Sequence, residues 1–186
     1  DAGYWREDEA CEESLTAVRT NGTNIGSFLD TDSRMRVLDF YRAWHIATAK
    51  SQIYFAKAIK ERYRGEKLTG AFYGSYGCTD FFYVSTAGGV LEILDSGAMD
   101  FLSAPGVYVN RQPGGFTGQR EMPDSFALRN KLFIVEEDTR THLESPHFRA
   151  MFDYYDTEDS VNVLKRDFGR NLWESLPAWW YDHHLG

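Results

Sequence analysis

Cysteine is scarce in this chain of 186 residues, with only Cys11 and Cys78, far apart in the sequence. Their spacing matches neither a zinc site nor a disulfide framework, so we expect two free thiols and no bound metal or cofactor. The first strand-like segment is not followed by G-x-G-x-x-G, and the chain contains no P-loop. A nucleotide site therefore has no support.

Long apolar runs and an excess of positive charge are also missing. No segment approaches the roughly 20 apolar residues that a membrane-spanning helix needs. The formal charge of −8 argues against nucleic acid, whose binding depends on Lys and Arg, and against anionic membrane surfaces. The chain begins at Asp1 without a methionine, so we expect a processed chain and favour a secreted or periplasmic location.

Aromatic residues, in contrast, are abundant, at 16% of the chain. Hydrophobic residues make up 42% and charged residues 26%, which is typical of a globular protein long enough to bury a core. Aromatic rings also suit sugar binding, because the C–H faces of a pyranose stack on their apolar faces.

The chain divides into an irregular polar segment, residues 1–33, and one domain, residues 34–186. Amphipathic helices are predicted at residues 35–64, 86–98 and 157–172. Strands are predicted at residues 68–74, 100–105, 131–136 and 176–182. A long loop rich in Gly and Pro is predicted at residues 106–123. Helices that alternate with strands indicate an α/β fold with a parallel sheet.

The segment at residues 131–142 holds the main candidate site. Its apolar start predicts a buried strand, and apolar residues on both faces favour a parallel sheet covered by helices. The strand runs directly into charged residues: Glu136, Glu137, Asp138, Arg140 and His142. Clustered carboxylates are costly unless they are paired or used, and the carboxyl ends of parallel strands are where α/β proteins place their chemistry. A plainer alternative is that the acids cap a helix.

Four strings in order, at residues 67–74, 101–111, 136–142 and 179–182, carry a family resemblance. Together they resemble the C-terminal half of the (β/α)8 TIM-barrel catalytic domain of β-galactosidase-like glycoside hydrolases, close to family 42. The resemblance covers residues 35–182. It implies about four βα units, with the four strands as the fifth to eighth of the barrel, and a retaining glycosidase acting on a carbohydrate.

The resemblance also implies a set of site residues. Glu136 would be the nucleophile, and Glu137 is the alternative because adjacent acids allow a shift of one residue. Arg140 would help by lowering the pKa of the nucleophile. Residues expected to contact the sugar are Tyr73, Tyr108, Arg111, Asp138, Arg140, His142, Trp180 and Asp182.

One part of the family pattern is missing. The general acid/base of these enzymes is a Glu that follows Asn, and no Asn-Glu dipeptide occurs in this chain. The chain is then a piece of a longer enzyme, or a second chain supplies the other half, or catalysis has been lost. A half-barrel would expose sheet edges, so we expect self-association or a partner chain. The alternatives are a non-catalytic carbohydrate-binding or assembly module, and a small α/β protein without a sugar role.

Overall fold

The computed structural model of the chain describes residues 31–73, 87–147, 149 and 155–181. The two cysteines and nearly all of the predicted polar segment lie outside these residues, as does most of residues 147–155. Structural statements below therefore concern the described part of the chain.

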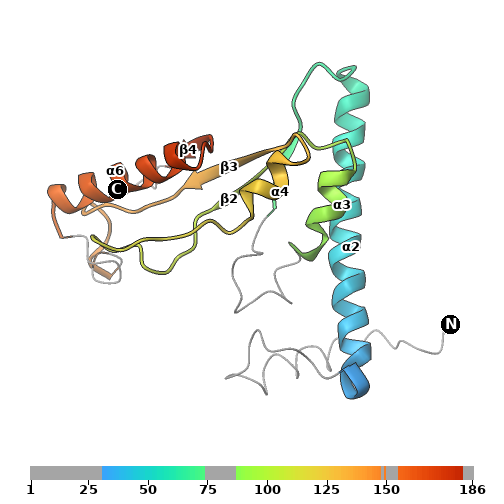
Figure 1. Cartoon of the computed structure of the whole chain (residues 1–186), viewed down its shortest axis with the longest axis horizontal. Coiled ribbons are helices and arrows are strands. Elements are labelled where there is room, and N and C mark those ends of the chain that lie inside the picture. The colour runs from blue at the N-terminus through green and yellow to red at the C-terminus, as the bar shows by residue number, and fades with distance from the viewer. Residues whose placement is uncertain (1–30, 74–86, 148, 150–154, 182–186) are drawn as a thin grey trace.

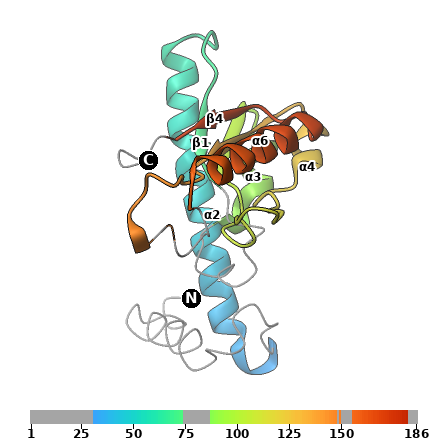
Figure 2. The ribbon, with the colours of Figure 1, turned by 90° about the vertical axis from the view of Figure 1, so that its left-hand side faces the viewer.

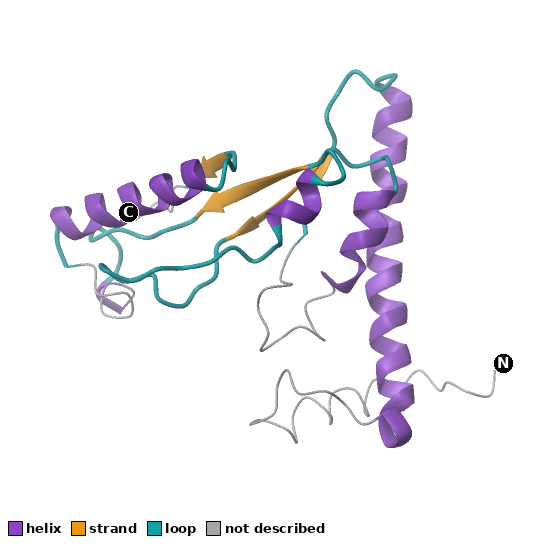
Figure 3. Cartoon of the chain, viewed as in Figure 1, coloured by secondary structure: helices purple, strands orange, loops and turns teal. Residues whose placement is uncertain are grey.

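The described elements alternate between helices and strands (Figure 1, Figure 3). The helices are α2 (Thr31–Arg62), the 3-10 helix η2 (Ala87–Gly89), α3 (Val90–Asp95), α4 (Pro123–Ala127) and α6 (Thr157–Trp173). The strands are β1 (Gly70–Phe72), β2 (Phe101–Pro105), β3 (Leu132–Glu137) and β4 (Ala178–Trp180). The long predicted helices and all predicted strands are present, and α4 is an additional helix after the long loop.

The strands form one four-stranded sheet in the order β1-β2-β3-β4, with every neighbouring pair parallel. Spatial order thus follows chain order. Ser103 of β2 pairs with Ile134 of β3, and Glu136 pairs with Trp179 of β4. The predicted α/β fold with a parallel sheet is confirmed.

The two faces of this sheet differ in what covers them. Alternate residues of β3 point to opposite faces, and Phe133, Val135 and Glu137 are buried while Ile134 and Glu136 are half-buried. The first face, here called the covered face, packs against residues of α2, α3 and α4 and bonds to α6. We call the other the open face.

The core lies between the covered face and the helices. Leu102 and Val135 from the strands and Ile93 from α3 are fully buried. The rings of Phe126 in α4 and Phe133 in β3 pack with centroids 5.3 Å apart. Each such side chain contributes about 1.5–3 kcal/mol by leaving water.

The helix α2 is the longest element and continues beyond the sheet (Figure 1, Figure 2). It buries Tyr41, His45, Ala49 and Ala56 at spacings of four and seven residues. The 3-10 helix η2 packs closely against α2. A Cβ on Gly89 would lie only 2.7 Å from the Ala49 Cβ and 2.8 Å from the His45 carbonyl oxygen, so a side chain would not fit there.

The predicted apolar face of α2 was partly wrong. Spacings of three and four residues in the sequence predict that this face also includes Tyr54, Phe55 and Ile59, but these side chains are 69%, 65% and 44% exposed. The side of α2 that contacts η2 and α3 carries Tyr41, His45, Ala49 and Ala56, and Tyr54, Phe55 and Ile59 lie outside that contact.

The helix α6 begins at Thr157, where the sequence predicts its start, and is capped by the preceding residue. The side chain of Asp156, rather than that of Thr157, accepts a hydrogen bond from the Asp159 N–H at 2.9 Å. Its buried positions include charged residues, Asp167 and Arg170, beside Val163. The helix therefore brings charge, as well as apolar surface, to the sheet.

Candidate functional site

The candidate site lies at the carboxyl end of β3, where the acid cluster meets α6 and the loop of residues 106–122 (Figure 1). Strand alternation divides the cluster between the two faces. Glu137 and Thr139 bond to α6, whereas Glu136 and Asp138 lie on the other side. The adjacent acids Glu136 and Glu137 therefore have different surroundings.

Glu137 is enclosed on the covered face, with an exposed fraction of 3%. Its Oε1 accepts from Arg170 Nη2 at 2.7 Å and from Asn171 Nδ2 at 2.5 Å. Burial raises the pKa of Glu137 above its usual value, and Arg170 and Asn171 act in the opposite direction. This carboxylate ties α6 to the end of β3.

A second buried acid on this side is Asp167 of α6. Its Oδ2 accepts from the Thr139 hydroxyl at 2.7 Å, and its Oδ1 lies 2.8 Å from Arg166 Nη2. The segment after β3 is thereby bonded to α6 at a second point.

Asp138 is bonded to two residues of the loop. Its Oδ2 accepts from the Tyr108 hydroxyl at 2.5 Å, and its Oδ1 pairs with Arg111 Nη1 at 2.7 Å. Burial, followed by the hydrogen bond to Asp138, raises the pKa of Tyr108 to about 12. The phenol therefore stays protonated at neutral pH and donates the hydrogen bond to Asp138. The structure brings together the predicted site residues Tyr108, Arg111 and Asp138.

Arginines hold the loop itself in place. Arg111 donates to the carbonyl oxygens of Val107 and Gly106 at 2.9 and 2.7 Å. Arg166 Nη1 donates to three carbonyl oxygens, those of Arg111, Gln112 and Gly115, at 3.0 to 3.2 Å. These charged donors satisfy loop carbonyls that no strand or helix pairs. Arg111 is predicted to contact a sugar, but its N–H groups donate to loop carbonyl oxygens and to Asp138.

Glu136 is half-buried, and its carboxylate forms no hydrogen bond or ion pair with the described residues. Burial and the neighbouring Asp138 raise the pKa of Glu136, while Arg120 and Arg111 lower it. Glu136 is thus the acid of the cluster that the described structure leaves available.

Arg120, like Arg170, is a site residue that the sequence analysis missed. Its guanidinium carbon lies 4.5 Å from the centre of the Tyr108 ring, and that of Arg111 lies 4.2 Å from the same ring. Its Nε is 3.4 Å from the Gly106 carbonyl oxygen. Arg120 lies in a loop without periodicity, 16 residues before Glu136, so no sequence signal connects the two.

Two other predicted site residues bond to neighbouring segments instead. Arg140, expected to act on Glu136, forms an ion pair with Glu144, and the groups that lower the pKa of Glu136 are Arg120 and Arg111. The ring Nδ1 of His142 lies 2.9 Å from the Ser160 Oγ at the start of α6. Both side chains stabilise the segment that connects β3 to α6.

The remaining predicted residues are spread around the sheet. Tyr73 is buried on the covered face, where its hydroxyl accepts from the Gly89 N–H at 3.1 Å, and burial raises the pKa of Tyr73 to about 12. Trp180 pairs in register with Glu137 and is 47% exposed. Asp182 lies outside the described residues.

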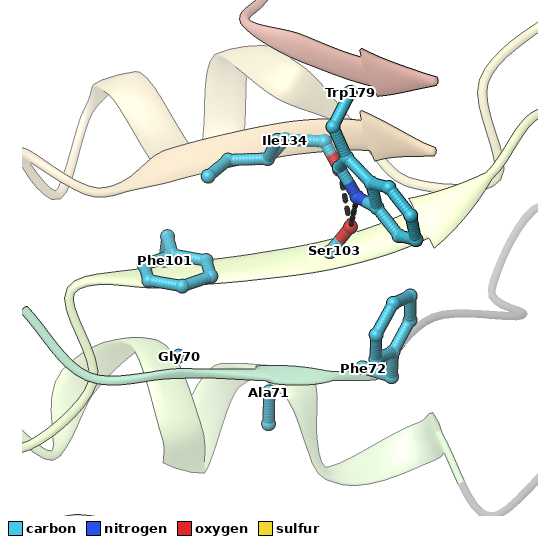
Figure 4. A pocket seen from close by; sticks show the side chains of 7 residues that line it. All are labelled: Gly70, Ala71, Phe72, Phe101, Ser103, Ile134 and Trp179. Carbon is cyan, nitrogen blue, oxygen red and sulfur yellow. Dashed lines mark hydrogen bonds between the residues drawn. The ribbon is translucent and has the colours of Figure 1, made fainter. Parts of the chain in front are cut away.

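A groove of about 370 Å³ runs along the open face (Figure 4). It is lined by strand residues only: Gly70, Ala71, Phe72, Phe101, Ser103, Ile134 and Trp179. The Trp179 indole donates to the Ser103 hydroxyl at 3.1 Å, and its ring meets that of Phe72 edge to face at 5.8 Å. The groove is apolar apart from this hydrogen bond.

The fold and site define an α/β protein with an acid–arginine cluster at the carboxyl edge of a parallel sheet. No known protein family, curated protein or solved structure matches the chain. Across the described ranges, no helix is long and apolar enough to span a bilayer. In the same ranges, no group of three or more His, Cys, Asp or Glu side chains is placed to hold a metal ion.

The pairing of Glu137 with Arg170 predicts a large effect of replacing the arginine. Arg170→Met should lower the free energy of unfolding in urea at pH 7 by about 3–5 kcal/mol, because it leaves a buried carboxylate without its cation. The loss should be smaller near pH 5. Without Arg170 the folded-state pKa of Glu137 rises further, so the folded state binds more protons than the unfolded state and stability increases as pH falls.

Arg129→Met is the matched control, because Arg129 pairs with Asp95 at the surface. It should change stability by less than about 1 kcal/mol at either pH. An equal effect of the two replacements would contradict the role given to Arg170.

Proposed function

We propose that this chain carries the nucleophile half of a retaining, β-galactosidase-type glycoside hydrolase, with Glu136 as the nucleophile. The observation that carries the proposal is the position of Glu136 and the lack of a bonding partner for its carboxylate among the described residues. Glu136 is half-buried at the carboxyl end of a parallel strand, and the described residues leave its carboxylate unbonded, whereas Glu137, Asp138 and Asp167 are all paired.

The surroundings of Glu136 suit a carboxylate that attacks a sugar. A nucleophile must be ionised. Burial and Asp138 raise the pKa of Glu136, and Arg120 and Arg111 offset part of that rise by favouring the charged form. Asp138, held by Tyr108 and Arg111, is fixed beside it as a hydroxyl acceptor. Glu137 remains the alternative nucleophile of the family pattern, but its enclosure by Arg170 and Asn171 favours Glu136.

We also propose that the sheet is half of an eight-stranded barrel. Three features support this: all four strands are parallel, their spatial order follows chain order, and helices from every described crossover contact the same face. A closed barrel fills its interior with side chains from the inner face. The apolar groove lined by Phe72, Phe101 and Trp179 supports the proposal as the surface that would face this interior.

A second copy of the chain is the occupant that we propose for the open face. Since the strands are parallel, β4 of one copy can continue the sheet into β1 of the other around a two-fold axis. The same axis would bring Glu136 of both copies to one mouth of the barrel, and a retaining glycosidase needs two carboxyl groups about 5–5.5 Å apart. In such a dimer, Glu136 of the second copy would take the place of the missing general acid/base.

A non-catalytic carbohydrate-binding or assembly module is the second candidate. It is favoured by the lack of a second unpaired carboxylate beside Glu136 among the described residues. Such a module would bind sugar without turnover.

Covalent labelling tests the catalytic proposal. We expect an activated fluoro-sugar of galacto configuration to form an adduct on Glu136, mapped by mass spectrometry of peptides. Labelling should slow as pH is lowered, because the raised pKa of Glu136 leaves less of it ionised in acid.

Glu136→Gln should abolish the adduct, and Glu158→Gln, at an exposed acid of α6, should leave it unchanged. An adduct elsewhere, Glu137 included, would refute the assignment of Glu136. Sugar binding by the wild-type chain without any adduct, unaffected by Glu136→Gln, would favour the non-catalytic module.

Sedimentation tests the barrel proposal. The wild-type chain should be a dimer at micromolar concentration, and Phe72→Lys should weaken the dimer by tenfold or more, since it places a charge in a contact worth roughly 1.5–3 kcal/mol. Phe72 is 59% exposed, so the replacement should not unfold the chain.

Leu128→Lys, on an even more exposed residue that follows α4, is the control and should leave the dimer intact. A monomeric wild-type chain, or a dimer that Phe72→Lys does not weaken, would contradict completion of the barrel by a second copy.

A further inference from the structure

Most of the charged side chains around the site form ion pairs with one another. Glu137 pairs with Arg170, Asp138 with Arg111, and Asp167 with Arg166. Within the described part of the site, Glu136 and Arg120 are the two charges that belong to no ion pair. They act on each other electrostatically, but among the described residues no ion pair joins them.

Arg120 is held in a way that leaves the end of its side chain available. The guanidinium lies over the Tyr108 ring, and Nε points to the Gly106 carbonyl oxygen. The two terminal Nη groups have no acceptor among the described residues. A guanidinium that rests on an aromatic ring and keeps its outer nitrogens unbonded is arranged to receive a ligand.

We propose that Arg120 binds the carboxylate of an acidic sugar, so that the substrate class of this site is a uronide rather than a neutral galactoside. This inference rests on the proposed function, because it takes Glu136 as the group that faces the sugar.

A carboxylate fits this position better than a hydroxyl does. The planar guanidinium presents two parallel N–H groups, which match the two oxygens of a carboxylate. Arg120 is half-buried, and a partly desolvated cation gains more from an anion than from a neutral acceptor. Glu136 repels a second negative charge, so an acidic substrate needs a cation at this place to enter the site.

Binding of two matched sugars tests the inference. Titration calorimetry of the whole chain in low salt would compare the methyl β-glycoside of galacturonic acid with that of galactose. We expect the uronide to bind at least about tenfold more tightly, as charge-assisted hydrogen bonds are stronger than neutral ones.

Three variants assign the difference to Arg120. Arg120→Gln should remove the preference for the uronide, and Arg120→Lys should restore part of it, because lysine keeps the charge without the fork. Arg129→Gln, which removes the same charge at the surface pair with Asp95, should keep the full preference.

Equal affinity of the wild-type chain for both sugars, or binding of neither, would overturn the inference. So would a preference that survives Arg120→Gln. The outcome is separable from that of the labelling experiment. A uronide preference lost in Arg120→Gln, in a chain whose Glu136 is never labelled, would support acid recognition and refute the catalytic role.

Discussion

The buried pair of Glu137 and Arg170 is the interaction on which the site depends. Glu137 ends β3 on the covered face, and Arg170 lies 33 residues later in α6. Their contact, with Asn171, positions the helix against the sheet, and Arg170 also donates to the Thr117 carbonyl oxygen of the loop. One arginine thus fixes strand, helix and loop relative to one another. A buried charge that loses its partner is strongly destabilising, so these three segments keep their arrangement together.

Strand alternation then decides what the neighbouring acids can do. Because Glu137 points to α6, Glu136 and Asp138 lie on the other side of the chain. Asp138 is neutralised by Arg111 and bonded to Tyr108. Among the described residues, Glu136 and Arg120 remain without an ion pair beside that fixed group. Glu137 is enclosed on the covered face, whereas Glu136 lies on the other side without an ion pair among the described residues. The proposed roles of Glu136 and Arg120 both follow from this difference.

Periodicity in the sequence was enough to predict the parallel sheet and the helices α2 and α6, and to place residues 136–138 at the carboxyl end of a strand. Periodicity could not predict which face each acid points to, because the residues of β3 that precede the acids are apolar on both faces. The partners Arg120 and Arg170 come from a loop and a helix distant in sequence, and only tertiary contacts reveal them. Arg140 and His142 were plausible by proximity, but their bonds to Glu144 and Ser160 belong to the connection between β3 and α6.

The most direct test of this account is the pKa of Glu136, measured by carboxyl carbon NMR in the wild-type chain and in Arg120→Gln. We expect Glu136 to titrate above the usual value for glutamate, because it is partly buried beside Asp138. We expect its pKa to rise further when the Arg120 charge is removed. A Glu136 that titrates at the usual value, and is unaffected by Arg120→Gln, would contradict the claim that these two residues form the unpaired centre of the site.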